Sequence, residues 1–241
     1  NMITKQKKTK AIAVMQPTFL PWLGYFSLIN SVDEFVFLDH VQFEKRSWQQ
    51  RNIIRTFGPE IWLTVPVLSK GKQLQSIKNV EILYEGNRSP LLKIMKSIEL
   101  NYKKTPFYIK YADEFNTILL QKPRYLSELN QSFIRWICDK LEITTSLRVS
   151  SDLSVKGSKA DLLVNICESR GATYYLSPPG SKIYLDETSA FNAAGIQLEY
   201  FDYKPQRYTQ IHGDFIPYMS VIDALFNIGT DSLKTLIMKG S

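Results

Sequence analysis

The stretch that decides the fold is Ala11 to Asn52, AIAVMQPTFLPWLGYFSLINSVDEFVFLDHVQFEKRSWQQRN. Its first five residues, Ala11 to Met15, form a short apolar run that is typical of a buried strand. A turn rich in Pro, Gly and aromatic residues follows, and then a short amphipathic helix over Phe26 to Asn30. A second apolar and aromatic run, Glu34 to Leu38, predicts another strand. Strand, helix and strand in this order predict a βαβ unit with parallel strands.

Two polar clusters follow the ends of these strands. In open α/β sheets, ligands bind outside the carboxyl ends of the strands, so both clusters are candidate site segments. The second cluster combines Arg side chains, which match phosphate geometry, with an indole face that can stack on a base or a sugar. A solvated loop, and a turn whose aromatic residues fill the core, remain the alternatives. The candidates for substrate or phosphate binding are Gln16, Tyr25, Lys45, Arg46, Trp48, Arg51 and Asn52, and Asp39 is a candidate for proton transfer.

The composition places limits on function. The 241 residues are 44% hydrophobic and 22% charged, which is ordinary for a globular protein. No apolar run approaches the roughly 20 residues of a membrane span, and no signal peptide is visible, so we expect a cytoplasmic protein. The net charge of +7 favours an anionic partner, and four of these charges lie in the Lys-rich first ten residues. Without a nucleic-acid motif, a phosphorylated or nucleotide-linked small molecule fits better than nucleic acid.

Cysteine and histidine are scarce. Cys138 and Cys167 have no metal-ligand spacing, and the only histidines are His40 and His212, so we expect no metal site. Cys138 lies on the apolar face of a predicted helix and is expected in the core. The sequence indicates no particular cofactor and leaves the oligomeric state open.

The rest of the chain returns to alternating strands and helices after a helical block. Ile61 to Val67 and Ile77 to Leu83 predict an antiparallel pair of strands. Three helices are predicted between Ser89 and Leu141, the first with Ser89 as its N-cap and Pro90 at its first position. We therefore predict an N-terminal α/β portion over residues 11–88, a helical insertion over 89–143, and a C-terminal α/β portion over 144–241 that completes the sheet. The fold class predicted is α/β, a Rossmann-like, mainly parallel sheet built from both ends of the chain with a three-helix insertion.

Two further site candidates lie in the C-terminal portion. The loop from Ser177 to Lys182 follows a predicted strand, and its backbone N–H groups with the hydroxyls of Ser177 and Ser181 suit a phosphate or carboxylate. His212 precedes a Gly in a Pro-rich loop and is a second candidate for proton transfer. If all strands lie parallel in one sheet, Gln16, Asp39 and Arg51 are expected near Ser177 or Ser181.

Four blocks of the sequence, taken together, resemble the WbqC-like protein family. They are MQPTFLPWLGYFSLINSVDEFVFLDHVQFEKRSWQQRN, IWLTVPV, YYLSPPGSKIYLDETSAFNAAGIQLEYFDY and FIPYMSVIDALFNIG, in this order over almost the whole chain beyond Lys10. The resemblance implies a bacterial protein of surface-polysaccharide (O-antigen) biosynthesis with a transferase-like role in sugar modification. It supplies no catalytic residues, so the site candidates rest on the residues themselves.

Three functional hypotheses remain open. The first is an enzyme that transfers an acyl, aminoacyl or similar group to or from an activated sugar or nucleotide-sugar. The second is a non-catalytic binding or scaffold protein of the polysaccharide machinery, and the third is a nucleic-acid-binding protein with a continuous basic stripe. A deep cleft lined by Arg46, Arg51 and Asp39 would favour an enzyme, and a flat aromatic patch would favour a partner surface.

Overall fold

The computed structural model describes residues 9–186 and 188–240, without the side chains of residues 183 and 184. The chain divides into two compact units, each assembled from three segments. The first unit comprises the chain up to Met15, Leu28–Leu38 and Thr145–Asp202. The second comprises Gln16–Ser27, Asp39–Thr144 and the chain from Tyr203 onward. The three-part division by sequence position stays a prediction.

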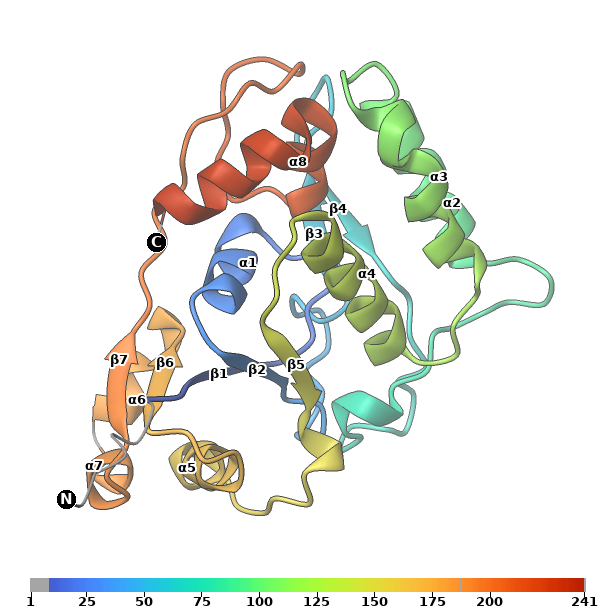
Figure 1. Ribbon diagram of the computed structural model, residues 1–241. Helices are drawn as coiled ribbons and strands as arrows, with labels where there is room; N and C mark the ends of the chain where they lie inside the picture. The colour runs from blue at the N-terminus through green and yellow to red at the C-terminus, as the bar shows by residue number, and fades with distance from the viewer. Residues whose placement is uncertain (1–8, 187, 241) are drawn as a thin grey trace. The chain divides into compact units, whose positions relative to one another are not determined.

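The first unit is built on a five-stranded parallel sheet (Figure 1). Its strands are β1 (Ala11–Met15), β2 (Glu34–Phe37), β5 (Ser146–Val149), β6 (Tyr174–Ser177) and β7 (Gln197–Tyr200), in the spatial order β5-β2-β1-β6-β7. This order reverses direction between β1 and β6, as it does in Rossmann folds. The predicted fold class is therefore confirmed, including the assembly of one sheet from both ends of the chain.

Burial follows the order of the strands. All four residues of β2 are buried, whereas β5 and β7 alternate between exposed and half-buried positions, as expected at the edges of a sheet. The helices α5 (Lys159–Ser169) and α7 (Ala190–Ala193) lie on the same side of the sheet (Figure 1). Phe191 of α7 stacks on Tyr175 of β6 with ring centroids 5.2 Å apart. A separate short helix, α6 (Lys182–Asp186), ends before α7 begins.

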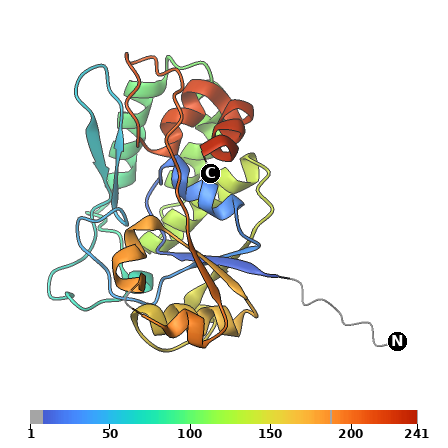
Figure 2. The same cartoon turned by 90° about the vertical axis from the view of Figure 1, so that its left-hand side faces the viewer.

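The second unit combines a two-stranded antiparallel sheet with helices. The elements are α1 (Leu23–Asn30), which runs from this unit into the first, β3 (Arg51–Ile54), β4 (Ile61–Thr64), α2 (Pro90–Tyr102), α3 (Tyr108–Leu120), α4 (Leu126–Lys140) and α8 (Val221–Gly240). Figure 2 shows the hairpin of β3 and β4 beside the helical block, and β4 shares pocket walls with α2. Phe115 of α3 packs on Phe133 of α4 and Phe226 of α8, at 4.9 Å and 5.9 Å between ring centroids. The predicted N-cap is present, since Ser89 Oγ accepts a hydrogen bond from the Leu91 N–H of α2.

The predicted antiparallel pairing of Ile61–Val67 with Ile77–Leu83 is confirmed only at one end. There Val67 and Ile82 form an isolated antiparallel bridge, with the Leu83 N–H on the Pro66 carbonyl and the Leu68 N–H on the Glu81 carbonyl, both at 2.9 Å. The strand β4 itself pairs with β3, which begins within the second polar cluster. Pro66 has no N–H to donate, and strand pairing of β4 ends before it. Residues 77–79 form a 3₁₀ turn, and the segment that follows bonds to the chain before α4 through Ile82 N–H to the Arg124 carbonyl, at 2.9 Å. The alternating pattern of residues 77–83 therefore reflects one-sided burial in a segment that forms isolated antiparallel bridges but no named strand.

A buried carboxylate organises the start of the parallel sheet. The Glu34 side chain is 2% exposed, and its oxygens contact Lys10 Nζ at 2.6 Å, Arg170 Nη2 at 2.9 Å and Arg148 Nε at 3.1 Å. Burial raises the pKa of the Glu34 carboxyl, but the hydrogen bonds from Lys10 and Arg170 outweigh that cost, and the pKa falls below its usual value. The charged form is therefore the one that stabilises the fold.

We expect Glu34→Gln to lower the free energy of unfolding at pH 7 by about 1–2 kcal/mol, because three cations lose their shared partner and remain partly solvated. The folded-state pKa is lowered, so the stabilisation is present above the unfolded pKa and is lost as pH falls through the folded value. The gap between wild type and variant in urea denaturation should therefore close on acidification. Glu142→Gln, in an exposed pair with Lys234, is the matched control. Equal stability of Glu34→Gln and wild type at pH 7 would contradict this account.

Candidate functional site

The hairpin of β3 and β4 presents one face to the interior and one to solvent. Its register pairs Arg51 with Thr64 and Asn52 with Leu63, so alternate residues point to opposite sides. Asn52 and Leu63 are buried, whereas Trp62 and Thr64 are exposed. Arg51 therefore projects on the same face as Trp62, its diagonal neighbour across the pair.

Three side chains stack on this outer face. The Arg51 guanidinium carbon lies 4.2 Å from the centre of the Trp62 ring, and Trp48 packs against the same indole with ring centroids 5.2 Å apart. Trp48 and Trp62 are 52% and 45% exposed, although large indoles are usually well covered. Among the described residues, no carboxylate pairs with Arg51, and its buried Nε donates no hydrogen bond. This Trp48–Arg51–Trp62 stack offers cationic donors beside two open aromatic faces.

Buried amides connect the turn after β1 to the hairpin and to α4. The Asn52 amide nitrogen donates to the carbonyls of Phe19 and Leu20, at 3.0 Å and 2.9 Å. The Asn130 amide nitrogen donates to the carbonyls of Pro17 and Gln49, at 3.2 Å and 2.8 Å. Asn52, predicted as a ligand contact, therefore supports the backbone of the turn.

Gln16 and Tyr25, the other two candidates that follow β1, also form hydrogen bonds in or next to this turn. Gln16 Oε1 accepts a hydrogen bond from Gln49 Nε2 at 3.0 Å, and its carbonyl accepts one from the Tyr25 hydroxyl at 2.9 Å. Tyr25 is buried, and burial raises its pKa well above the usual value, so the phenol stays protonated. Two acceptors, Gln49 Oε1 and Asn130 Oδ1, are buried and take no hydrogen bond from any described residue. Each of these two oxygens can therefore accept a hydrogen bond from an N–H or O–H group.

Lys45 and Arg46 lie on the exposed loop that precedes the stack. Both side chains are exposed, and no described carboxylate pairs with either. Arg46 has a left-handed backbone with φ of 58°, and its N–H donates to Gln50 Oε1 at 2.7 Å, which holds the loop. The loop thus carries two solvated cations next to Trp48 in the sequence.

The two candidates for proton transfer occupy different settings. Asp39 is 3% exposed, and its carbonyl accepts the Lys78 N–H at 2.8 Å. His212 packs between the rings of Phe57 and Tyr102, with centroids at 4.7 Å and 5.2 Å. Its Nε2 lies 2.7 Å from the Asn101 carbonyl, so in the neutral ring Nε2 carries the hydrogen. Its Nδ1 is buried and forms no hydrogen bond with a described residue. In the neutral ring this nitrogen carries the lone pair that can accept a proton.

A buried carboxylate network, not predicted from the sequence, lies around Asp223 in the first turn of α8. Asp223 is fully buried and accepts hydrogen bonds from Tyr208 at 2.6 Å, Tyr102 at 2.7 Å and Gln210 at 2.9 Å. Burial raises the pKa of Asp223 above its usual value despite these donors, and Asp223 in turn raises the pKa of both phenols after their own burial. The only sequence signal was one acid among the apolar residues that open α8.

The remaining candidates belong to the first unit. Ser177 ends β6 and is fully buried, and its carbonyl accepts the Phe201 N–H at 2.7 Å. Ser181 closes a 3₁₀ turn over Pro179–Ser181, with its N–H on the Pro178 carbonyl at 3.2 Å. The expected closeness of Ser177 or Ser181 to Gln16, Asp39 and Arg51 stays a prediction.

Both cysteines are core residues. Cys138 and Cys167 are buried, and burial raises the pKa of each thiol to about 12, so neither supplies a thiolate at neutral pH. In the described part of the chain, no three His, Cys, Asp or Glu side chains gather as metal ligands would. None of the described helices is both long enough and apolar enough to cross a membrane.

Comparison with known proteins settles the family. The model of the WbqC-like protein family matches residues 16–235. The chain belongs to the WbqC-like protein family. It is 37% identical over 225 residues to the uncharacterized protein Rv1507c of Mycobacterium tuberculosis. The matched region covers 92% of this chain and 96% of that protein. No solved structure matches the chain.

Replacing Asn52 should test its supporting role. We expect Asn52→Ala to lower the free energy of unfolding by about 2–4 kcal/mol, because two buried carbonyls lose their donor. Urea denaturation measures this loss, with Asn192→Ala on the exposed side of α7 as the matched control. A loss of stability no greater than that of the control would show that the turn does not depend on this amide.

Proposed function

We propose that this WbqC-like protein is a transferase of bacterial surface-polysaccharide (O-antigen) assembly that acts on an activated sugar or nucleotide-sugar. The observation that carries the proposal is the Trp48–Arg51–Trp62 stack. Its guanidinium lies on an indole without a carboxylate partner among the described residues, while both indoles remain open to solvent. A phosphate next to a ring-shaped group matches this combination.

The chemistry of the ligand follows from the three side chains. The guanidinium donates two parallel hydrogen bonds to a phosphate, and Lys45 and Arg46 would add charge from the preceding loop. The indole faces would pack on a base or on the C–H face of a pyranose. Gln16 directly follows β1, and Ser177 is the last residue of β6, the two strands between which the sheet order reverses. Because ligands of such sheets bind at the carboxyl ends of these strands, we propose both residues as ligand contacts.

Proton transfer is assigned to Asp39 or His212. His212 suits a base better, since the Asn101 carbonyl orients the ring and leaves the Nδ1 lone pair without a partner among the described residues. The transferred group is proposed to be an acyl, aminoacyl or similar group, whose acceptance by a hydroxyl or amine requires removal of a proton.

A non-catalytic binding or scaffold role is the second candidate, because the stack is an exposed aromatic surface. Two tryptophans about half exposed on one hairpin face are also what a partner surface presents. The two candidates differ in turnover. An acyltransferase without its acceptor is expected to pass the acyl group of an acylated nucleotide-sugar slowly to water, which releases a carboxylic acid, and a scaffold is not.

Ligand binding should raise thermal stability. With UDP-, GDP- or dTDP-sugars at about 100 times Kd, we expect a stabilisation of about 2.7 kcal/mol, or roughly 5–10 °C in Tm for a chain of this size. Arg51→Gln should remove the shift. Arg124→Gln should keep it, because Arg124 also lies on an aromatic ring, that of Tyr125, but does not belong to the stack. No shift with any nucleotide-sugar, or an unchanged shift in Arg51→Gln, would refute the proposal.

Loss of the acyl group separates enzyme from scaffold. Without an acceptor, the wild-type protein should slowly hydrolyse the ester of an O-acylated nucleotide-sugar, as the base takes a proton from water and the acyl group leaves as a carboxylic acid. His212→Gln keeps a donor for the Asn101 carbonyl but lacks a basic nitrogen, so it should abolish this hydrolysis while preserving the thermal shift. Chromatography of the deacylated nucleotide-sugar measures this. Binding without hydrolysis in the wild-type protein would favour the scaffold role.

A further inference from the structure

Two pockets adjoin between β4 and the first half of α2. One encloses about 320 Å³ and is lined by Trp62, Thr64 and Ser97 among others, and the second encloses about 300 Å³ beside Leu83, Glu85 and Arg88. Pro66, Pro90 and Lys93 line both pockets, so the two form one groove. We call it the β4–α2 groove. Each pocket reaches the size of small-molecule sites, roughly 300–1,000 Å³, so the groove has room for more than one sugar unit.

The groove begins at the Trp48–Arg51–Trp62 stack. Trp62 lines its first pocket and is also the ring on which Arg51 and Trp48 pack. A ligand lying in the groove can therefore reach the open indole of Trp62 without a break. This continuity argues for an extended ligand.

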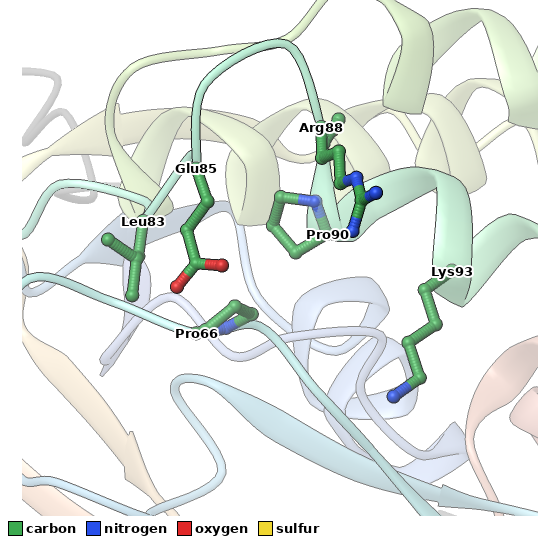
Figure 3. A pocket seen from close by; sticks show the side chains of 7 residues that line it. Pro66, Leu83, Glu85, Arg88, Pro90 and Lys93 are labelled. Carbon is green, nitrogen blue, oxygen red and sulfur yellow. The ribbon is translucent and has the colours of Figure 1, made fainter.

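The charged groups of the groove are not paired with one another. Figure 3 shows the Glu85 carboxylate above Pro66, with the side chains of Arg88 and Lys93 on the other side of Pro90. None of the three forms an ion pair with another described residue. Two cations and one carboxylate thus face an apolar floor of proline and leucine.

We propose that the β4–α2 groove binds an acidic oligosaccharide, the chain to which the protein adds its group. The role as acceptor rests on the proposed function, whereas the binding itself rests on the groove. The C–H face of a pyranose would pack on Trp62. Acidic substituents would pair with Lys93 and Arg88, and sugar hydroxyls would donate to Glu85.

A single-stranded nucleic acid is the main rival, since its bases also stack on tryptophan. Grooves for such strands follow the backbone with positive charge. Here Glu85 faces the same pocket as Arg88 and Lys93. A nucleic-acid strand carries a phosphate on every nucleotide, so a strand lying in the groove would place one of its phosphates near the Glu85 carboxylate, which would repel it. A sugar chain with isolated acidic groups and many hydroxyls uses both kinds of charge.

Calorimetric titration of the full chain tests the groove with three probes. They are a hyaluronan hexasaccharide, which alternates glucuronic acid with an amino sugar, an uncharged hexamer of N-acetylglucosamine, and hexauridylate. We expect the acidic hexasaccharide to bind about tenfold or more tightly than the uncharged one, because two cations face the groove. Hexauridylate should bind more weakly than the acidic hexasaccharide.

Variants locate the binding. Lys93→Gln and Arg88→Gln should each weaken acidic hexasaccharide binding by about threefold to tenfold, as expected for partly solvated ion pairs. Trp62→Ala should weaken it by about tenfold or more. Lys96→Gln is the matched control, since Lys96 is exposed on the same helix and lines neither pocket.

Equal affinity for the uncharged hexamer, tighter binding of hexauridylate, or unchanged affinity in Lys93→Gln would each overturn the groove assignment. The nucleotide-sugar shift is measured on Lys93→Gln and Arg88→Gln, because these two residues line the groove but lie outside the Trp48–Arg51–Trp62 stack. Loss of hexasaccharide binding with that shift intact leaves the proposed function standing. Absence of the shift with hexasaccharide binding intact refutes the nucleotide-sugar proposal and supports the groove.

Discussion

The carbonyl groups of the turn after β1 are the constraint on which the second unit depends. Pro17, Phe19 and Leu20 lie outside regular structure, and their buried carbonyls need donors. Asn52 of β3 and Asn130 of α4 supply them, so the turn, the hairpin and the helix hold one another in place. Because Asn52 must point inward, the alternation of the strand sends Arg51 outward onto Trp62. The position of the exposed stack is therefore a consequence of a buried amide one residue away.

Two buried carboxylates show how partners decide the sign of a pKa shift. Glu34 is surrounded by three cations, which lower its pKa against the cost of burial. Among the described residues, Asp223 has only neutral side-chain donors within hydrogen-bonding distance, two phenols and an amide, and burial raises its pKa. The stabilising contribution of Glu34 is lost in acid, whereas that of Asp223 is present below its unfolded pKa and lost as pH rises through its folded value. The contributions of these two carboxyls to stability thus depend on pH in opposite directions.

Local patterns predicted the parallel sheet and most of the helices, because apolar runs, caps and periodicity are encoded by neighbouring residues. Ser89 with Pro90 marked the start of α2, where the structure has the N-cap and the first residue of the helix. Long-range partners could not be predicted in this way. Nothing near Trp48 in the sequence indicates that Trp62 packs on it, and nothing near Asp223 indicates that Tyr102 reaches it. Asn52 was predicted as a ligand contact because its amide carries no local sign of which carbonyls it will bond.

The parallel sheet also determines when its strands can pair during synthesis of the chain on the ribosome. β1 pairs with β6, and the neighbouring hydrogen bond from Lys10 to Thr173 joins residues 163 positions apart. At about 5–20 residues per second, β1 waits roughly 8–30 s for β6 to be synthesised. During that interval Ile12 and Ala13, fully buried in the finished sheet, lack the neighbouring strand β6. The amino-terminal strand is thus a natural place for a chaperone to act, and its early exposure makes slow translation a hazard for correct assembly.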